Sequence, residues 1–176
     1  MQNQKLNIEM SNLVLTPKDL ADYKTEWLIN GFAERNKLIS LYAMPGSGKS
    51  ITALYLAIYM LEIKAIKKVI YLDMDNGLGT LKNRGLEQIL KKYPDLHYLS
   101  QAKKAPKDID PKTLIFSLSA FANESCKDTL IIFDSIRNFI SSSMSYDEVV
   151  MPTLNVLQKW HQYEKSYKSD KTQSQD

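Results

Sequence analysis

Apolar runs alternate with polar turns along the chain, and the lengths of these runs distinguish predicted strands from predicted helices. Short runs rich in aliphatic residues occur at 37–42, 69–73 and 129–133, each followed by a turn or a loop. Such runs are typical of buried strands, and the run at 37–42 is apolar enough to be covered on both faces. A weaker strand is predicted at 96–99. Helices are predicted at 50–64, 80–92, 111–122 and 147–165.

This alternation of strands with helices predicts an α/β fold with a mainly parallel sheet flanked by helices. The helix at 50–64 is apolar along almost its whole length, so we expect it to be packed between the sheet and neighbouring elements. The core is predicted to comprise residues 25–165. An N-terminal extension at 1–24 precedes it, and a polar C-terminal tail at 166–176 follows it.

The extension and the segment that follows it give shorter signals. A short strand is predicted at 12–16. Thr16 and Pro17 suit the N-cap and the first position of a helix at 18–23, because proline needs no N–H partner there. An apolar patch at 27–32 contains a glycine that predicts a turn.

Composition narrows the class of protein. At 176 residues and 44% hydrophobic content, the chain is expected to be a single globular domain. A net charge of +3 is too small to predict nucleic-acid binding by itself. The lysines at 103–112 are interpreted as a solvated loop, with a nucleic-acid contact as the less favoured alternative. The single cysteine excludes an internal disulfide. The two histidines lie far apart in the sequence, so a metal site built from histidine and cysteine ligands is not expected. The N-terminus shows no secretory signal, and the longest apolar stretch, 51–63, is too short to span a membrane, so a cytoplasmic location is expected.

The strongest chemical signal is the sequence Ala-Met-Pro-Gly-Ser-Gly-Lys-Ser at 43–50. It lies between a predicted strand and a predicted helix, which is the context that a phosphate-binding loop requires. Gly46 and Gly48 can adopt backbone angles closed to other residues, so successive N–H groups can turn toward an anion. The positive end of the following helix dipole would face the same anion.

This loop predicts a binding site for a nucleoside triphosphate. Lys49 would contact the β and γ phosphates, and the Ser50 hydroxyl would bind Mg²⁺. Ala43 stands where the motif has its first glycine, so the turn requires Ala43 to keep a negative φ. The alternative is a chance glycine turn before a buried helix. The residues expected to bind the nucleotide are Pro45, Gly46, Ser47, Gly48, Lys49, Ser50 and Ile51.

A second signal is the aspartate that ends the apolar run at 129–133. In parallel α/β sheets, the tips of the strands face the ligand crevice. With a phosphate-binding loop upstream, Asp134 is expected to hold Mg²⁺ together with Ser50, mostly through a bound water. The alternative is that Asp134 caps a helix that follows it.

Two further carboxylates follow the run at 69–73. Hydrolysis requires a group that orients and partly deprotonates the attacking water, and a carboxylate beside the magnesium strand could do this. Asp75 is the first candidate and Asp73 the second, with Lys49 completing the expected catalytic set. The alternative is a solvated acidic loop in which Asn76 and Gly77 form the turn.

Four motifs together resemble the RecA-like P-loop ATPases, and among them the RepA-like hexameric helicases and related AAA-family ATPases; the motifs lie at 27–32, 43–50, 71–77 and 130–135. The similarity runs from about residue 25 to 165. The resemblance implies that ATP is the nucleotide and Mg²⁺ the cofactor, with Asp134 as the Walker B carboxylate and the Asp75 position as the water-activating acid. That position is usually glutamate in the family, so the shorter aspartate implies a weak ATPase or a protein that binds ATP and barely hydrolyses it.

RecA-like domains continue beyond the helix that matches 147–165, with a strand that lies between the phosphate-loop strand and the Asp134 strand. The resemblance therefore predicts a RecA-like core incomplete at the C-terminus: either a truncated product, or a sheet in which those two strands are adjacent. It also implies a homo-oligomer that acts on single-stranded DNA in replication or recombination. The alternatives are a nucleotide-binding regulatory or interaction module with little or no hydrolysis and, less favoured, a small-molecule kinase.

Overall fold

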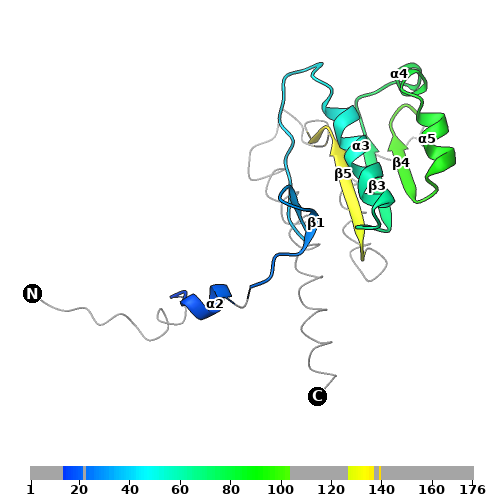
Figure 1. The fold of residues 1–176 in the computed structure, drawn as a ribbon. Helices are drawn as coiled ribbons and strands as arrows, with labels where there is room; N and C mark the ends of the chain where they lie inside the picture. The colour runs from blue at the N-terminus through cyan, green and yellow to red at the C-terminus, as the bar shows by residue number, and fades with distance from the viewer. Residues whose placement is uncertain (1–13, 22, 104–126, 137–138, 140–176) are drawn as a thin grey trace, which may run out of the picture.

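The computed structural model describes residues 14–21, 23–103, 127–136 and 139. Its centre is a parallel sheet of the order β4-β3-β5, in which β3 (Lys68–Asp73) lies between β4 (Leu96–Ser100) and β5 (Thr129–Asp134) (Figure 1). Both outer strands run parallel to β3. The predicted parallel sheet is therefore confirmed for these three strands. The helices predicted at 111–122 and 147–165 lie outside the described residues.

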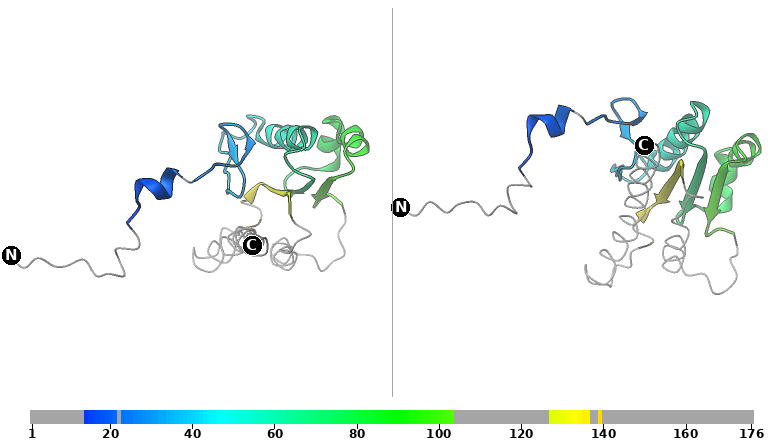
Figure 2. Two further views of the ribbon diagram at one scale, coloured as in Figure 1. Left: turned by 60° about the horizontal axis from the view of Figure 1, so that its bottom comes forward. Right: turned by 90° about the horizontal axis from the view of Figure 1, so that it is seen from below.

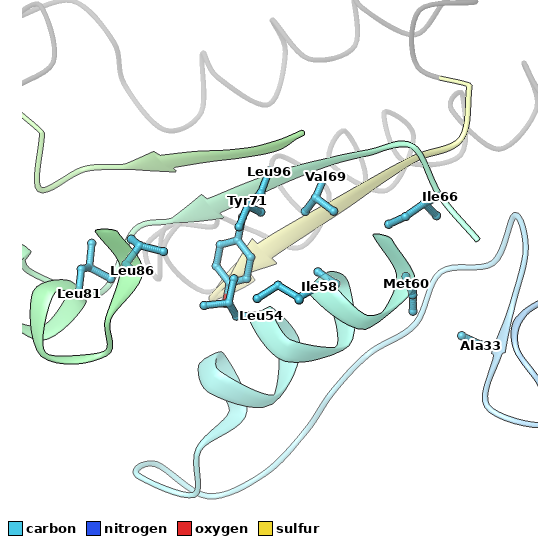
Figure 3. Close-up of a cluster of buried hydrophobic side chains, with 11 residues drawn as sticks. Ala33, Leu54, Ile58, Met60, Ile66, Val69, Tyr71, Leu81, Leu86 and Leu96 are labelled. Atoms are coloured by element: carbon cyan, nitrogen blue, oxygen red, sulfur yellow. The ribbon is translucent and has the colours of Figure 1, made fainter. Parts of the chain in front are cut away.

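One helix, α3 (Lys49–Glu62), covers one face of this sheet, as the views in Figure 2 show. Its buried side chains recur at helical spacing and are Leu54, Ala57, Ile58 and Met60. They pack in one cluster with Val69 and Tyr71 of β3, whose side chains point toward the helix in Figure 3. The helix predicted at 50–64 is confirmed with nearly the same bounds.

The outward face of α3 is exposed, which the sequence did not predict. Ile51, Tyr55 and Tyr59 follow one another at intervals of four residues and have exposed fractions of 42%, 58% and 48%. Side chains four residues apart lie on one face of a helix. The expectation that α3 is packed between the sheet and other elements is wrong for this face, because the sheet covers only the opposite one.

A single helix was predicted at 80–92, but the structure contains two. These are α4 (Leu78–Asn83) and α5 (Leu86–Lys92), and both bury leucines against the core. Gly85 lies between them with φ 72°, in the left-handed region. A residue in that conformation cannot continue a right-handed helix, so the chain turns there and a second helix begins.

The described residues before the loop contain a short helix and a hairpin. The helix α2 (Pro17–Ala21) is shorter than predicted, and Thr16 caps it: the Asp19 N–H donates to the Thr16 hydroxyl, 3.4 Å away. No strand forms at 14–16, and residues 12–13 lie outside the described residues. The antiparallel strands β1 (Trp27–Ile29) and β2 (Ala33–Glu34) follow, joined by the predicted glycine turn.

Arg35, which follows this hairpin, binds the residue just before the start of β5. Its Nη1 donates to Asp128 Oδ1 at 2.8 Å, and its Nη2 donates to the carbonyl oxygen of Ala65 at 2.7 Å. Lys67 Nζ lies 3.2 Å from Asp128 Oδ2. Burial alone would raise the pKa of Asp128, but Lys67 and Arg35 together hold it below its ordinary value of 3.8.

The predicted first core strand at 37–42 does not form. Residues 37–44 adopt no strand, and Leu38 and Tyr42 are 70% and 94% exposed. In Figure 1 the segment is the trace that links the hairpin to the loop before α3. Apolar residues do not make a strand without a neighbouring strand to pair their N–H and C=O groups, and no described strand pairs with this segment. The alternative of a sheet in which this segment lies next to β5 is therefore wrong for the described residues.

Candidate functional site

The loop at 43–50 has the backbone geometry that its glycines predict. Gly46 has φ 77° and Gly48 has φ 91°, both in the left-handed region that favours glycine. Apart from the glycine itself and its two chain neighbours, no described residue has a heavy atom within 4 Å of where a Cβ would stand at either position, so the space beside the loop is open there. Ala43 is not among the residues with positive φ, as the turn required.

The start of α3 offers unpaired N–H donors beside this loop. Gly48 is the N-cap and supplies no side-chain hydrogen bond, and the first helical bond runs from the Thr52 N–H to the Gly48 carbonyl at 2.9 Å. The N–H groups of Lys49, Ser50 and Ile51 make no hydrogen bond to any described residue. Uncapped donors at the positive end of a 14-residue helix are suited to binding an anion.

Lys49 folds back over its own loop. Its Nζ donates to the carbonyl oxygens of Ala43 at 2.8 Å and Met44 at 3.1 Å. An ammonium group carries three donors, so a third N–H remains for a phosphate oxygen while the other two stay in place. The lysine thus lies at the loop, where the motif requires it.

Asp134 lies at the tip of β5, close to the start of α3. The Tyr71 hydroxyl is 2.8 Å from Asp134 Oδ2 and 3.1 Å from the Ser50 carbonyl oxygen. One oxygen atom therefore links both elements, and Asp134 and the backbone of Ser50 lie on the same side of the sheet. The structure thus places the Asp134 side chain close to the backbone of Ser50, the other residue predicted to bind Mg²⁺.

The donor set of this corner fits Mg²⁺ bound with a nucleotide. Among the described residues, no group of three or more His, Cys, Asp or Glu side chains is placed to hold a metal ion. Mg²⁺ is usually held by one or two protein oxygens, with phosphate oxygens and waters completing its coordination. A hydroxyl from Ser50 and a carboxylate from Asp134 would form such a set, whereas a metal bound without nucleotide would require more protein ligands.

Asp73 is in register with Asp134 on the neighbouring strand but has different surroundings. Its side chain is fully buried. Its oxygens accept hydrogen bonds at 3.0 Å from the Asp75 N–H, the Asn76 N–H and the Asn76 side-chain amide, and at 2.6 Å from the Tyr98 hydroxyl. A carboxylate that accepts so many hydrogen bonds fixes the turn after β3. Little of its acceptor capacity is left for a proton from an attacking water.

Asp75 lies in the turn that Asp73 fixes, and its side chain is exposed. The turn is held against the Asp134 strand, because the Met74 N–H donates to the Asp134 carbonyl at 2.9 Å. The Gln101 N–H donates to the Asp73 carbonyl at 3.1 Å from the other side. Of the two candidate bases, Asp75 is therefore the accessible one.

Tyr71 and Tyr98, for which no role was predicted from the sequence, are central to this corner. Their rings stack, with centroids 4.7 Å apart and planes inclined by 10°. Burial raises the pKa of both phenols well above the ordinary value; the Asp134 charge adds to this at Tyr71, and the hydrogen bond to Asp73 adds to it at Tyr98. Both therefore remain protonated donors at neutral pH. A tyrosine inside a buried strand is a usable signal, because its hydroxyl needs a partner there.

Comparisons with known proteins agree with the loop-centred site. A family model described as an AAA domain matches residues 19–166, which is most of the chain. No curated protein and no solved structure shows significant similarity to it. In the described part, no helix is long and apolar enough to cross a membrane. The chain therefore belongs to the AAA domain family, whose members are nucleotide-binding ATPases with the P-loop fold.

Proposed function

We propose that this protein binds ATP together with Mg²⁺ at the loop 43–50 and hydrolyses it slowly. The observation that carries this proposal is the single hydroxyl of Tyr71, which lies within hydrogen-bond distance of both the Ser50 carbonyl and the Asp134 carboxylate. A phosphate-binding loop, the hydroxyl-bearing residue that follows it and a strand-tip carboxylate thus meet at one corner. Together they provide what a nucleotide–magnesium complex requires.

Each residue of the corner has a distinct role in this proposal. The N–H groups of the loop and of the first turn of α3 bind the phosphates, and Lys49 neutralises their charge. Ser50 and Asp134 hold Mg²⁺, which reduces the negative charge that builds up on the phosphates during transfer. Asp75 orients the attacking water and accepts its proton, with Asp73 as the less accessible alternative. Ile51 would contact a phosphate through its backbone N–H, which does not select the base. Pro45 has no N–H, and the Ser47 N–H donates to the Met44 carbonyl at 3.2 Å, so these two residues would line the loop beside the nucleotide.

The resemblance to the RecA-like and RepA-like ATPases supports a finer assignment. It favours ATP as the nucleotide, a homo-oligomer as the active form, and single-stranded DNA as a partner in replication or recombination. A RecA-like core over residues 25–165, with an extension at 1–24 and a tail at 166–176, and the cytoplasmic location belong to the same proposal. The lysine-rich stretch 103–112 lies outside the described residues except for Lys103, which is exposed.

A regulatory nucleotide-binding module is the second candidate, and one observation favours it. The residue at the water-activating position is Asp75, which is one methylene shorter than the glutamate usual in the family. It also lies in an exposed turn. A carboxylate that is short and solvated is a weak base for an attacking water, so bound ATP would persist.

Measuring ATP turnover with and without single-stranded DNA, for the wild type and Lys49→Ala, separates the candidates. An ATPase of the proposed type shows turnover that rises with DNA and is lost in the variant. A regulatory module binds Mg²⁺-ATP with negligible turnover and no response to DNA. A chain that fails to bind ATP at millimolar concentration contradicts both. Lys82→Ala is the matched control, because Lys82 is an exposed lysine on α4.

A further inference from the structure

We propose that Tyr71 is a positioning residue: its hydroxyl holds the Asp134 carboxylate in the orientation that accepts Mg²⁺ and sets the position of Asp134 relative to Ser50. The proposal rests on the function proposed above, since it concerns the same metal. Its basis is a contact that no motif predicts. Tyr71 comes from the central strand β3, whereas Ser50 and Asp134 come from α3 and β5.

The ring of Tyr71 is fixed on all sides. Its exposed fraction is 1%, and it belongs to the same core cluster as Leu54 and Ile58 of α3, which lie next to it in Figure 3. Its other face stacks on Tyr98 of the neighbouring strand. A ring held by the core in this way cannot follow its partners, so its hydroxyl is a fixed point to which the Asp134 carboxylate must adjust.

The hydroxyl has one proton and two acceptors. The shorter bond, 2.8 Å, goes to the charged Asp134 Oδ2, and the longer distance, 3.1 Å, separates the hydroxyl from the uncharged Ser50 carbonyl. A bond to a carboxylate is the stronger of the two, so the proton resides mainly there. Oδ1 of Asp134 accepts no hydrogen bond from any described residue and remains for the cation or for one of its waters.

The contact also limits how closely α3 and β5 can approach each other. The Ser50 carbonyl and the Asp134 carboxylate lie against the same hydroxyl oxygen, so the hydroxyl acts as a spacer between the two elements that supply the metal ligands. Partners that orient metal-ligating carboxylates in this way commonly set metal affinity by one to two orders of magnitude. Tyr71 therefore affects Mg²⁺ without touching it.

Tyr98 provides a matched control within the same stack. It is the register partner of Tyr71 on β4, and its hydroxyl donates to Asp73 rather than to Asp134. Tyr71→Phe and Tyr98→Phe each remove one oxygen from one of two stacked rings and keep the ring volume. They differ mainly in which carboxylate loses its donor.

The experiment measures ATP binding by the full chain over a range of Mg²⁺ concentrations, and in EDTA, for the wild type and both variants. We expect Tyr71→Phe to raise the Mg²⁺ concentration for half-maximal binding about tenfold. Metal-free ATP binding should stay at the wild-type level. Tyr98→Phe should leave the Mg²⁺ dependence as in the wild type. In an Asp134→Asn background, Tyr71→Phe should cause no further shift, because the group it orients no longer binds the cation.

Other outcomes overturn the proposal in distinguishable ways. An unchanged Mg²⁺ dependence in Tyr71→Phe contradicts it. An equal shift in Tyr98→Phe, or a parallel loss of metal-free ATP binding in Tyr71→Phe, also contradicts it, because either result would indicate a general structural role. A Tyr71→Phe shift that persists in the Asp134→Asn background excludes action through Asp134. A wild type that binds ATP without regard to Mg²⁺ refutes the metal site. One that binds no ATP at all refutes the proposed function as well.

Discussion

The tips of β3 and β5 present the same side chain at paired positions, and their surroundings differ. Asp73 and Asp134 are register partners on adjacent parallel strands. Asp73 is fully buried and accepts hydrogen bonds from two backbone amides, one side-chain amide and one phenol. Asp134 is half-buried and accepts one hydrogen bond to its side chain, from Tyr71, among the described residues. Position at a strand tip therefore does not distinguish these two carboxylates, whereas unused acceptor capacity does.

The largest effect should come from Asp73→Asn, on stability. The NH₂ group of the new asparagine would face groups that now donate hydrogen bonds to the carboxylate. These buried donors would then lose their acceptor. We expect the free energy of unfolding to fall by about 3 kcal/mol, measured by urea denaturation. Asp134→Asn, which disturbs one bond, should cost about 1 kcal/mol. Equal costs at the two positions would contradict the distinction between them.

The next largest effect concerns Asp75, the exposed carboxylate of the turn that Asp73 fixes. Asp75→Asn should lower steady-state ATP turnover about 100-fold while leaving the affinity for Mg²⁺-ATP unchanged, because a lost proton acceptor slows the chemical step. Asp75→Glu is the control, and its longer side chain should preserve or raise turnover. Unchanged turnover in Asp75→Asn would return the role of base to Asp73 or to a residue outside the described part.

The smallest effect concerns Asp128, a third carboxylate, which lies just before the opposite end of β5. Its pKa is lowered, so its ion pairs stabilise the fold above its ordinary value of 3.8 and this stabilisation is lost as pH falls below it. Asp128→Asn should cost about 1 kcal/mol at pH 7. The difference from the wild type should shrink below about pH 4 in urea unfolding experiments. Asparagine suits the test, because it tolerates the φ of 57° at this position. A difference that persists at pH 3 would assign the cost to something other than charge.

Sequence reasoning predicted the parts of this molecule that are determined locally. The strands β3, β4 and β5 and the helix α3 correspond to apolar runs of suitable length, and each forms close to its predicted bounds. The glycines of the loop and the φ of Ala43 also follow from the motif, since local backbone geometry decides them. Gly85 shows the limit of this approach. A single glycine within a helical pattern of apolar residues destabilises a helix by only about 1 kcal/mol, so a continuous helix was predicted, but the chain breaks into two helices there.

What could not be predicted depends on which segments become neighbours. The run at 37–42 has the composition of a buried strand, but no described strand pairs with it and it stays exposed. Tyr71 and Tyr98 stack only because β4 and β3 are paired in that register. The contact of Tyr71 with Asp134 requires, in addition, that β5 lie on the other side of β3. A single sequence does not specify strand order or register, so the contrast between Asp73 and Asp134 could not be inferred from it.

The most direct test of this account is a double-mutant cycle on Ser50 and Asp134, measured by calorimetric titration of ATP with and without Mg²⁺. Mg²⁺ should tighten ATP binding by the wild type, and Ser50→Ala or Asp134→Asn should each remove most of that gain, roughly tenfold or more. The double variant should then lose little beyond either single change, because both residues hold the same ion. Losses that add fully, or ATP binding by the wild type that does not respond to Mg²⁺, would contradict a shared ion.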